Sequence, residues 1–524
     1  MLCRAGAVSN GTHGIPALSI GKPLLYCRFM PLKDPDQWRT AGPSRRTFLA
    51  GSFGAAVLAL GTPELPAIAD GESYVIRWER YRQTILGLGF EIQSDSIGSG
   101  NIGLPEGTAS VPHDLVSSEL SRFYSELIRA GGDRGFRYCR LALGLYLRGL
   151  SGDGRNIIGR WPEQMEELRD MVAGSGLEGV SVEYWSPAPY WKSNGSWVGG
   201  TLKHEDQAFL SQFADSALRD VAYLEENGLP VIWWGLQNEP DLVTTYSSCT
   251  YTDSLYFNAF RTVASRLRAK YPSIRIHANS FGGQHGIGGA AIRGDSRTLA
   301  LVDAWTWHRI GTDSRELLPG MGNFSEESMG RAVYNNEFEY LTWDARAAPW
   351  YTVNTAQSIM NWMVFHDSPT WIWLHALKPT YNDESLGYSL GIWRPWDDDD
   401  FSQFPDLPKG HWTWNAPNWN AVAGFLRHLP WNAVRVEVDE PQLDSNRRIM
   451  AWIGPDRRRT FVLTNRTDVP HRFEVDVGSK AAFSGTRYGH DINNQSLGTK
   501  AAMTLSINVP AYRIEFWTET IGQQ

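Results

Sequence analysis

The chain is poor in cysteine: Cys3, Cys27, Cys139 and Cys249 are the only four in 524 residues. Their separations match neither the paired spacing of zinc or redox sites nor a dense disulfide framework. A glycine-rich phosphate loop is also missing after the first predicted strand, because Gly87-Leu88-Gly89 lies within that strand. These absences argue against a zinc protein, a disulfide scaffold and a dinucleotide-binding domain. We expect no metal and no cofactor.

Basic charge is scarce as well. Lys and Arg number 49 against 57 Asp and Glu, which gives a net charge of −8, and no basic stripe occurs. A phosphate-tracking surface needs such a stripe, so we expect no nucleic-acid partner. Long apolar runs are absent too. The run 48–60 has only 13 residues, whereas a helix needs about 20 to cross a bilayer.

That short run belongs to a segment with the features of an export signal. The sequence Ser-Arg-Arg-Thr-Phe-Leu at 44–49 leads into it, and Ala-Ile-Ala at 67–69 supplies a small-residue cleavage pattern. Together these features resemble a twin-arginine signal. We therefore predict that residues 1–69 are a leader, with Met1 or Met30 as the start, and that the protein is periplasmic or secreted. We expect no membrane insertion after cleavage, and a monomer.

The mature chain alternates short β-type runs with amphipathic helical stretches over residues 85–429. The eight runs are Ile85–Gln93, Arg137–Leu143, Gly179–Trp185, Pro230–Gln237, Ser273–Ala278, Val302–His308, Ala332–Glu337 and Thr370–His375. Strand–helix alternation implies parallel strands with helical crossovers, and eight units predict an α/β fold, a (β/α)₈ TIM barrel. A doubly wound open sheet is the alternative.

The helical period stops after residue 430. Short alternating runs separated by turn residues then predict an appended antiparallel β-sandwich over residues 430–524. The segment 70–84 also has the pattern of a strand. We expect it to join the sandwich before the chain enters the barrel.

Two of the predicted strands end in glutamates. The fourth runs into Gln237-Asn238-Glu239-Pro240, and the seventh into Asn335-Asn336-Glu337-Phe338-Glu339. In a barrel, the carboxyl ends of the strands build the active site. Two carboxylates that face one cleft from different strands can divide the roles of acid and nucleophile.

The segment Trp185–Gly195, Trp-Ser-Pro-Ala-Pro-Tyr-Trp-Lys-Ser-Asn-Gly, resembles the Trp-Ser-x-Pro-x-Trp-x-Lys-x-Asn-Gly segment after strand three in glycoside hydrolase family 30 of clan A. The family includes glucosylceramidases, β-1,6-glucanases and xylanases. The resemblance covers about residues 85–520. It implies a (β/α)₈ barrel with a β-sandwich built from both chain ends, and a retaining mechanism.

The resemblance also implies roles for the strand-end residues. Glu239 matches the acid/base, Asn238 the residue that binds a substrate hydroxyl, and Glu337 the nucleophile. Glu339 stands two residues further along, on the same side of a strand, and is the alternative nucleophile.

Two further positions match the family pattern. Arg140, on the second predicted strand, matches an arginine that contacts the nucleophile and keeps it ionised; the alternative is a salt bridge at the barrel bottom. His308, at the end of the sixth, matches a histidine that lines the sugar site. The family's His-Trp-Tyr reads His308-Arg309-Ile310 here, so the tyrosine is missing. Arg309 suggests room for an anionic sugar such as a uronate.

Aromatic residues are abundant, with 23 Trp, 20 Tyr and 21 Phe. Either they fill a large interior or they form surfaces on which a flat ligand stacks. Sugar rings stack on indoles through their C–H faces, and strand alternation lets only about half of the strand-end residues face a cleft. We predict that Trp185, Trp191 and Trp373 bind substrate, and that Trp233, Trp234 and Trp371 pack the barrel.

The sequence thus predicts an exported retaining glycoside hydrolase that cleaves β-glycosidic bonds of an oligo- or polysaccharide. Two alternatives remain open: a carbohydrate-binding protein that has lost turnover, and a transglycosylase that uses the same glutamate pair. The first would be marked by a missing carboxylate, and both carboxylates are present.

Overall fold

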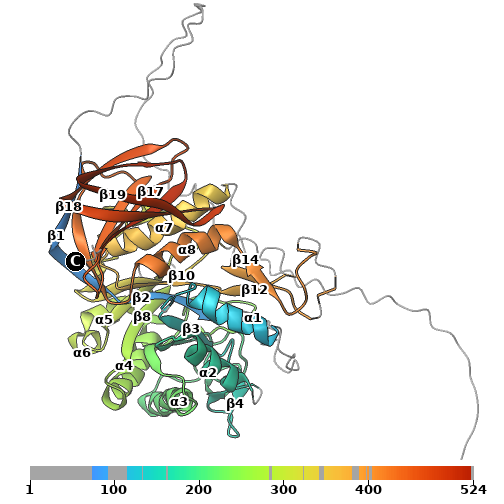
Figure 1. Cartoon of the computed structure of the whole chain (residues 1–524). Coiled ribbons are helices and arrows are strands. Elements are labelled where there is room, and N and C mark those ends of the chain that lie inside the picture. Colours follow the sequence, from blue (N-terminus) through green and yellow to red (C-terminus); the bar gives the residue numbers. More distant parts are fainter. Residues whose placement is uncertain are drawn as a thin grey trace, which may run out of the picture. The chain divides into compact units, whose positions relative to one another are not determined.

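A computed structural model describes residues 73–92, 115–132, 134–160, 163–281, 286–322, 324–340, 347–380, 389–396, 398–399 and 404–520. The predicted leader, residues 1–69, lies outside this part of the chain. Two architectures make up the described residues: a closed barrel of parallel strands surrounded by helices, and a C-terminal antiparallel sheet (Figure 1).

Eight strands form the barrel, as predicted. In chain order they are β2 (Gly87–Ile92), β3 (Tyr138–Leu143), β6 (Gly179–Tyr184), β7 (Val231–Gly235), β8 (Arg275–Phe281), β9 (Ala304–His308), β10 (Ala332–Phe338) and β11 (Thr370–Trp373). Each pairs in parallel with the next, and β11 returns to pair with β2. This last pairing closes the barrel and excludes the open doubly wound sheet.

Helices follow the strands as crossovers. They are α1 (Ser117–Arg122), which continues as a π-helical turn, α2 (Gln164–Ser175), α3 (Gln207–Glu226), α4 (Asp253–Lys270), α5 (Gly289–Gly294), α6 (Ser296–Leu299), α7 (Ala348–Phe365) and α8 (Ala416–His428). The two longest of the barrel's first half begin at side-chain caps. Asp206 accepts from Phe209 N at the start of α3, and Thr252 accepts from Leu255 N at the start of α4. Among the described residues, no helix is both long and apolar enough to cross a membrane.

A cluster of buried side chains from five of the strands fills part of the barrel interior. Its members are Tyr138, Trp233, Ala304, Tyr334 and Ile372. Because Ile372 points inward, the pleat of β11 sends Trp371 and Trp373 to the outer face, where both pack on Phe338. The prediction that Trp373 binds substrate is therefore wrong: Trp373 shares the outward face of Trp371 and is fully buried there.

The C-terminal sheet takes strands from both ends of the described chain. It consists of β1 (Tyr74–Ile85), β15 (Ala433–Asp439), β16 (Arg447–Ile453), β17 (Arg459–Asn465), β18 (His471–Gly489), β19 (Ile492–Val509) and β20 (Arg513–Glu519). Neighbouring strands are antiparallel, except that β18 also meets β1 in parallel, so the sheet curls around one apolar core. Figure 1 shows β1, in blue, beside the orange and red C-terminal strands.

Smaller elements decorate the barrel. β4 (Gly149–Leu150) pairs with β5 (Ile157–Ile158), and β12 (Leu377–Pro379), β13 (Gly391–Trp393) and β14 (Trp412–Trp414) form a three-stranded sheet. Twelve tryptophans in the described ranges are fully buried, so these side chains are interior packing.

Candidate active site

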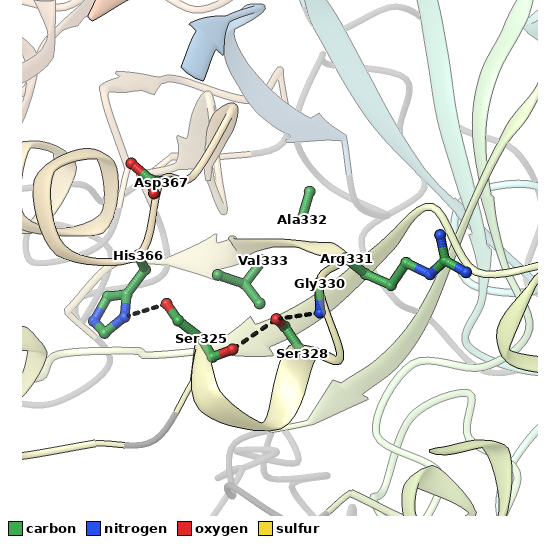
Figure 2. A pocket seen from close by; sticks show the side chains of 8 residues that line it. All are labelled: Ser325, Ser328, Gly330, Arg331, Ala332, Val333, His366 and Asp367. Carbon is green, nitrogen blue, oxygen red and sulfur yellow. Dashed lines mark hydrogen bonds between the residues drawn. The ribbon is translucent and has the colours of Figure 1, made fainter. Parts of the chain in front are cut away.

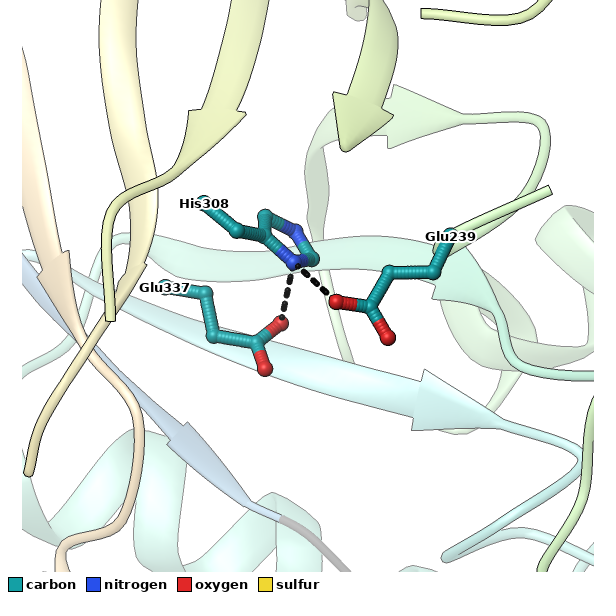
Figure 3. A group of neighbouring side chains, drawn as sticks. All are labelled: Glu239, His308 and Glu337. Carbon is teal, nitrogen blue, oxygen red and sulfur yellow. Dashed lines mark hydrogen bonds and ion pairs between the residues drawn. The ribbon is translucent and has the colours of Figure 1, made fainter. Parts of the chain in front are cut away.

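Glu239, His308 and Glu337 meet at the carboxyl ends of the barrel strands, as Figure 3 shows. Glu239 follows β7, His308 ends β9 and Glu337 lies near the end of β10. The Nδ1 atom of His308 lies 3.0 Å from Oε1 of Glu239 and 3.2 Å from Oε2 of Glu337. One oxygen of each carboxylate and a ring nitrogen of the histidine all lie within 4.8 Å of one another. The two predicted glutamates are thus brought together.

The backbone at Glu239 has an unusual conformation. Its φ is +44°, in the left-handed region that non-glycine residues rarely adopt. Two hydrogen bonds hold it there: Glu239 N donates to Ser280 O (2.8 Å), and Leu242 N donates to Glu239 O (3.0 Å). Such conformations persist only when surrounding contacts enforce them, and they cluster at functional sites.

A β-bulge places Glu337. On β10, Asn335 pairs with Trp307 and Glu337 pairs with His308, so Asn336 has no partner of its own on β9. The extra residue lets two consecutive side chains reach the barrel interior. Asn336 Nδ2 donates to Ser280 Oγ (3.0 Å) and to Glu183 Oε2 (3.3 Å), while Glu337 accepts from Arg140.

Arg140 lies beneath the pair and is fully buried. Its Nη1 donates to Glu337 Oε2 at 2.9 Å, and its Nη2 donates to Asn238 Oδ1 at 2.7 Å. It also forms ion pairs with Glu91 and Glu183. The geometry excludes the alternative of a barrel-bottom salt bridge for Arg140.

Burial and neighbouring charges perturb the titration of this group. Burial raises the pKa of Glu337, against the opposing effects of His308 and Arg140. For His308, burial disfavours the charged ring, but Glu337 and Glu239 outweigh it and raise the imidazole pKa. Burial also raises the pKa of Asp241, two residues beyond Glu239, and the charge of Glu239 adds to the effect. The protonation of each of these groups therefore depends on the charge of its neighbours.

Glu339 does not join the group. It is fully buried, and its Oε2 lies 2.6 Å from Nδ1 of His375, just beyond the end of β11. The structure thus places Glu337, and not Glu339, beside Glu239 and Arg140.

The tryptophans predicted to stack on a sugar are buried and contact protein groups instead. Trp191 is 2% exposed, packs on Phe209 and Phe213 of α3, and donates its indole N–H to Arg155 O at 2.7 Å. The prediction for Trp191 is wrong, because the loop after β6 turns this ring inward onto a helix.

Trp185 does lie at the site, but its ring faces a protein group. The guanidinium carbon of Arg140 stands 4.5 Å from the ring centroid, and Trp185 is 2% exposed. The stacking partner of Trp185 is therefore Arg140, through a cation–π contact, and the role predicted for it is corrected accordingly.

Two buried carboxylates at the site were not among the predicted site residues. Glu91 on β2 and Glu183 on β6 are at most 1% exposed. The sequence signal was present: each is a charged residue inside an otherwise apolar strand, where a charge must be paired. Cross-strand register places Glu91 directly opposite Arg140. A third unpredicted residue, His277 on β8, lies 4.0 Å from Glu183, and burial lowers its pKa to about 4.

The donor set of Glu239, His308 and Glu337 has the composition of a divalent-cation site. Arg140, however, donates to Oε2 of Glu337, the same oxygen that lies 3.2 Å from His308 Nδ1. A guanidinium at that position opposes a second cation, so we assign no metal to this group.

A cavity of about 310 Å³ lies elsewhere, beside Ala332 and Val333 at the opposite end of β10 (Figure 2). Its histidine is hydrogen-bonded through both ring nitrogens. His366 contacts Ser325 Oγ through Nδ1 and Leu317 O through Nε2, each at 3.0 Å. This cavity has no part in the arrangement around Glu239 and Glu337.

No protein-family profile and no curated protein matches the chain. Solved structures do. The catalytic domain of GH30 xylanase C from Talaromyces cellulolyticus aligns with a TM-score of 0.64 at 16% identity, over 86% of this chain and 100% of that one. An endo-β1,6-glucanase aligns with a TM-score of 0.63 at 15% identity, over 87% and 96%.

A conserved exported protein from Bacteroides fragilis aligns with a TM-score of 0.67 at 12% identity, over 85% of this chain and 100% of that one. At such identities the likeness concerns the fold: a TIM barrel with a C-terminal antiparallel sheet domain, as in structures of glycoside hydrolase family 30.

Proposed function

We propose that the chain is an exported, retaining β-glycosidase in which Glu337 is the nucleophile and Glu239 the acid/base. The observation that carries the proposal is the proximity of the two carboxylates, which have oxygens within 4.8 Å, with Arg140 bound to one of them. Retaining glycosidases hold their carboxyl groups about 5–5.5 Å apart, whereas inverting enzymes leave about 6.5–9.5 Å for a water molecule.

The surroundings favour this division of roles. Glu337 accepts from Arg140, and a guanidinium stabilises the ionised form that attacks carbon. The Glu239 side chain is 18% exposed, against 7% for Glu337, so it is the carboxyl that reaches a leaving group and water. The amide of Asn238 is oriented as well. Because its Oδ1 accepts from Arg140, its Nδ2 is left to donate to a substrate hydroxyl.

The reaction then takes two displacements. The Glu337 carboxylate forms a bond to the anomeric carbon while the glycosidic C–O bond breaks, and Glu239 gives its proton to the departing oxygen. Glu239, now ionised, takes a proton from water as the water oxygen attacks the same carbon and releases Glu337. Two inversions leave the anomeric configuration unchanged.

Product stereochemistry tests the proposal. The protein produced from residue 70 onward would be screened on aryl β-glycosides and on β-glucan, xylan and galactan, and the first-formed anomer read by proton NMR. Retention supports the proposal, and inversion contradicts it.

Substitution of the carboxylates tests the residues. Glu239→Gln and Glu337→Gln should each lose at least about 1000-fold in kcat while the proteins stay folded. Glu339→Gln is the matched control on the same strand end and should stay active. An active Glu337→Gln would overturn the assignment.

The sugar itself stays open, since the similar structures include both a xylanase and a β1,6-glucanase. A uronate would need a cationic side chain at the sugar site, for which Arg309 was the candidate. The Arg309 guanidinium instead forms an ion pair with Glu316 and lies 5.7 Å from the ring of Phe324, so it does not support the uronate hypothesis. Transfer to a sugar hydroxyl uses the same glutamates, and product analysis at high acceptor concentration separates it from hydrolysis.

Export by the twin-arginine route is supported by the Arg-Arg pattern at 44–49, and export in general by the likeness to an exported protein. A substitution of both arginines by lysine should retain the protein in the cytoplasm of its producing cell. Unchanged export of that variant would contradict this part of the proposal.

A further inference from the structure

Three buried carboxylates share the single guanidinium of Arg140. Glu183 Oε2 accepts from Nη2 at 2.5 Å and from Nε at 3.2 Å, Glu91 accepts from Nη1, and Glu337 Oε2 accepts from the same Nη1 at 2.9 Å. Only Glu337 belongs to the catalytic pair. The other two bind the arginine from strands β6 and β2 and are fully buried.

Glu183 binds the Nε and Nη2 atoms of Arg140 and so fixes the orientation of its guanidinium. A guanidinium is planar and rigid, so a carboxylate that binds Nε and Nη2 fixes where Nη1 points. Trp185 covers one face of the same plane at 4.5 Å. The donor to Glu337 and the donor to Asn238 are therefore both oriented by contacts that do not themselves reach the substrate site.

Charged and titratable groups from five strands of the barrel, and from the segment after β7, contact Glu337 or lie in the network of ion pairs around it. They are Arg140 from β3, Glu91 from β2, Glu183 from β6, Glu239 and Asp241 from the segment after β7, His277 from β8 and His308 from β9. Burial lowers the pKa of His277 to about 4, which leaves it neutral at pH 7. The carboxylates thus outnumber the cations, and the positive charge of Arg140 is shared among Glu91, Glu183 and Glu337.

We propose that Glu183 is a positioning residue for the nucleophile: it fixes Arg140 so that Nη1 meets Glu337, and it takes part of the arginine's charge away from Glu337. The inference rests on the proposed role of Glu337. Glu183 itself touches neither substrate nor the reacting atoms.

The division of charge has a direct consequence for Glu337. Burial acts to raise the pKa of Glu183, but the charge of Arg140 and the hydrogen bonds from Arg140 and Ser280 outweigh it and lower that pKa, so Glu183 is ionised at neutral pH. When its charge is removed, more of the field of Arg140 acts on Glu337. The Glu337 carboxyl then ionises more readily.

Two variants separate the two parts of the role. Glu183→Gln keeps an oxygen for Nη2 and removes only the charge, so the acid limb of the kcat/KM–pH profile should move down by about one unit. Glu183→Ala also removes the hydrogen bonds that orient Arg140, so kcat/KM should fall about 100-fold. The loss of kcat/KM should be smaller in Glu183→Gln than in Glu183→Ala.

A matched control lies on the same pair of strands. Arg137, just before β3, binds Glu178, just before β6, through Nε at 2.6 Å and Nη2 at 2.8 Å. Glu178→Gln breaks an Arg–Glu pair between these strands at the opposite end and should leave the acid limb unmoved. An acid limb that shifts equally in both variants, or in neither, would overturn the proposal.

The test does not depend on turnover alone. If the wild type cleaves no glycoside, the proposed function fails. The ionisation of Glu337 can still be followed through its carboxyl carbon by ¹³C NMR in protein labelled at glutamate. The Glu337 signal is assigned by its loss in Glu337→Gln. A Glu337 signal that titrates at lower pH in Glu183→Gln than in wild type supports the charge sharing. An unchanged titration refutes it.

Discussion

Replacement of Arg140 by methionine is the perturbation to which this structure should be most sensitive. Three buried carboxylates, Glu91, Glu183 and Glu337, would lose their common partner, while methionine fills a similar volume. Removing one partner of a buried ion pair costs about 3–5 kcal/mol, because an uncompensated charge remains. We expect a loss in this range at pH 7.5, with activity abolished.

The loss should depend on pH in a definite direction. In the wild type, Arg140 helps to lower the pKa of Glu183, so that contribution to stability is present at neutral pH and is lost as pH falls through the lowered value. Without the arginine, burial dominates and raises the carboxyl pKa values, so the folded variant gains protons and relative stability as pH falls. The difference between the two proteins should therefore shrink at pH 5.

The assay is urea denaturation followed by tryptophan fluorescence at pH 7.5 and 5.0. Arg137→Met is the control, because its partner Glu178 is 37% exposed and can be solvated when the arginine is lost. A loss below about 1 kcal/mol for Arg140→Met, or one that is equal at both pH values, would refute the reasoning.

Three other predictions follow from the described residues. Trp191→Phe removes the indole donor to Arg155 O and should cost about 1–2 kcal/mol in urea denaturation with KM unchanged; a raised KM at unchanged stability would restore Trp191 as a sugar platform. Burial lowers the pKa of Lys192, which donates to three neutral oxygens, to about 8. The unfolded chain thus binds more protons above that pH, so wild-type stability should rise relative to Lys192→Met between pH 8 and about 10, and a constant difference would contradict this. Because burial raises the pKa of Glu337, the acid limb of kcat/KM should lie above the value of an ordinary glutamate; a limb at or below about 4.3 would count against that burial effect.

The barrel could be predicted from the sequence because each of its strands is a short apolar run, and the crossover helices have their own period. The strand ends then located Glu239, His308 and Glu337, since parallel strands present their carboxyl ends at one face. Arg140 was predicted from the family resemblance, which matches it to an arginine on the second strand of the barrel.

The tryptophans could not be assigned in this way. Trp371 and Trp373 are two residues apart and lie on the same face of β11, but the sequence does not show which face points inward. Only the register of β11 in the closed barrel shows that Ile372 is the inward residue. Trp191 ends a 3₁₀ turn (Pro189–Trp191) that is too short to show a period in the sequence, and the direction of its ring depends on the packing against α3. The bulge at Asn336 was equally hidden, because it arises from pairing between β9 and β10 rather than from the residues themselves.

The identity of the residue that bonds to the sugar is the central claim, and covalent trapping tests it most directly. The wild type would be treated with the 2-deoxy-2-fluoro analogue of its best aryl β-glycoside, digested and sequenced by mass spectrometry. The account predicts one added glycosyl group, attached to Glu337. A label on Glu339, or glycoside turnover with no covalent adduct under any trapping condition, would contradict it.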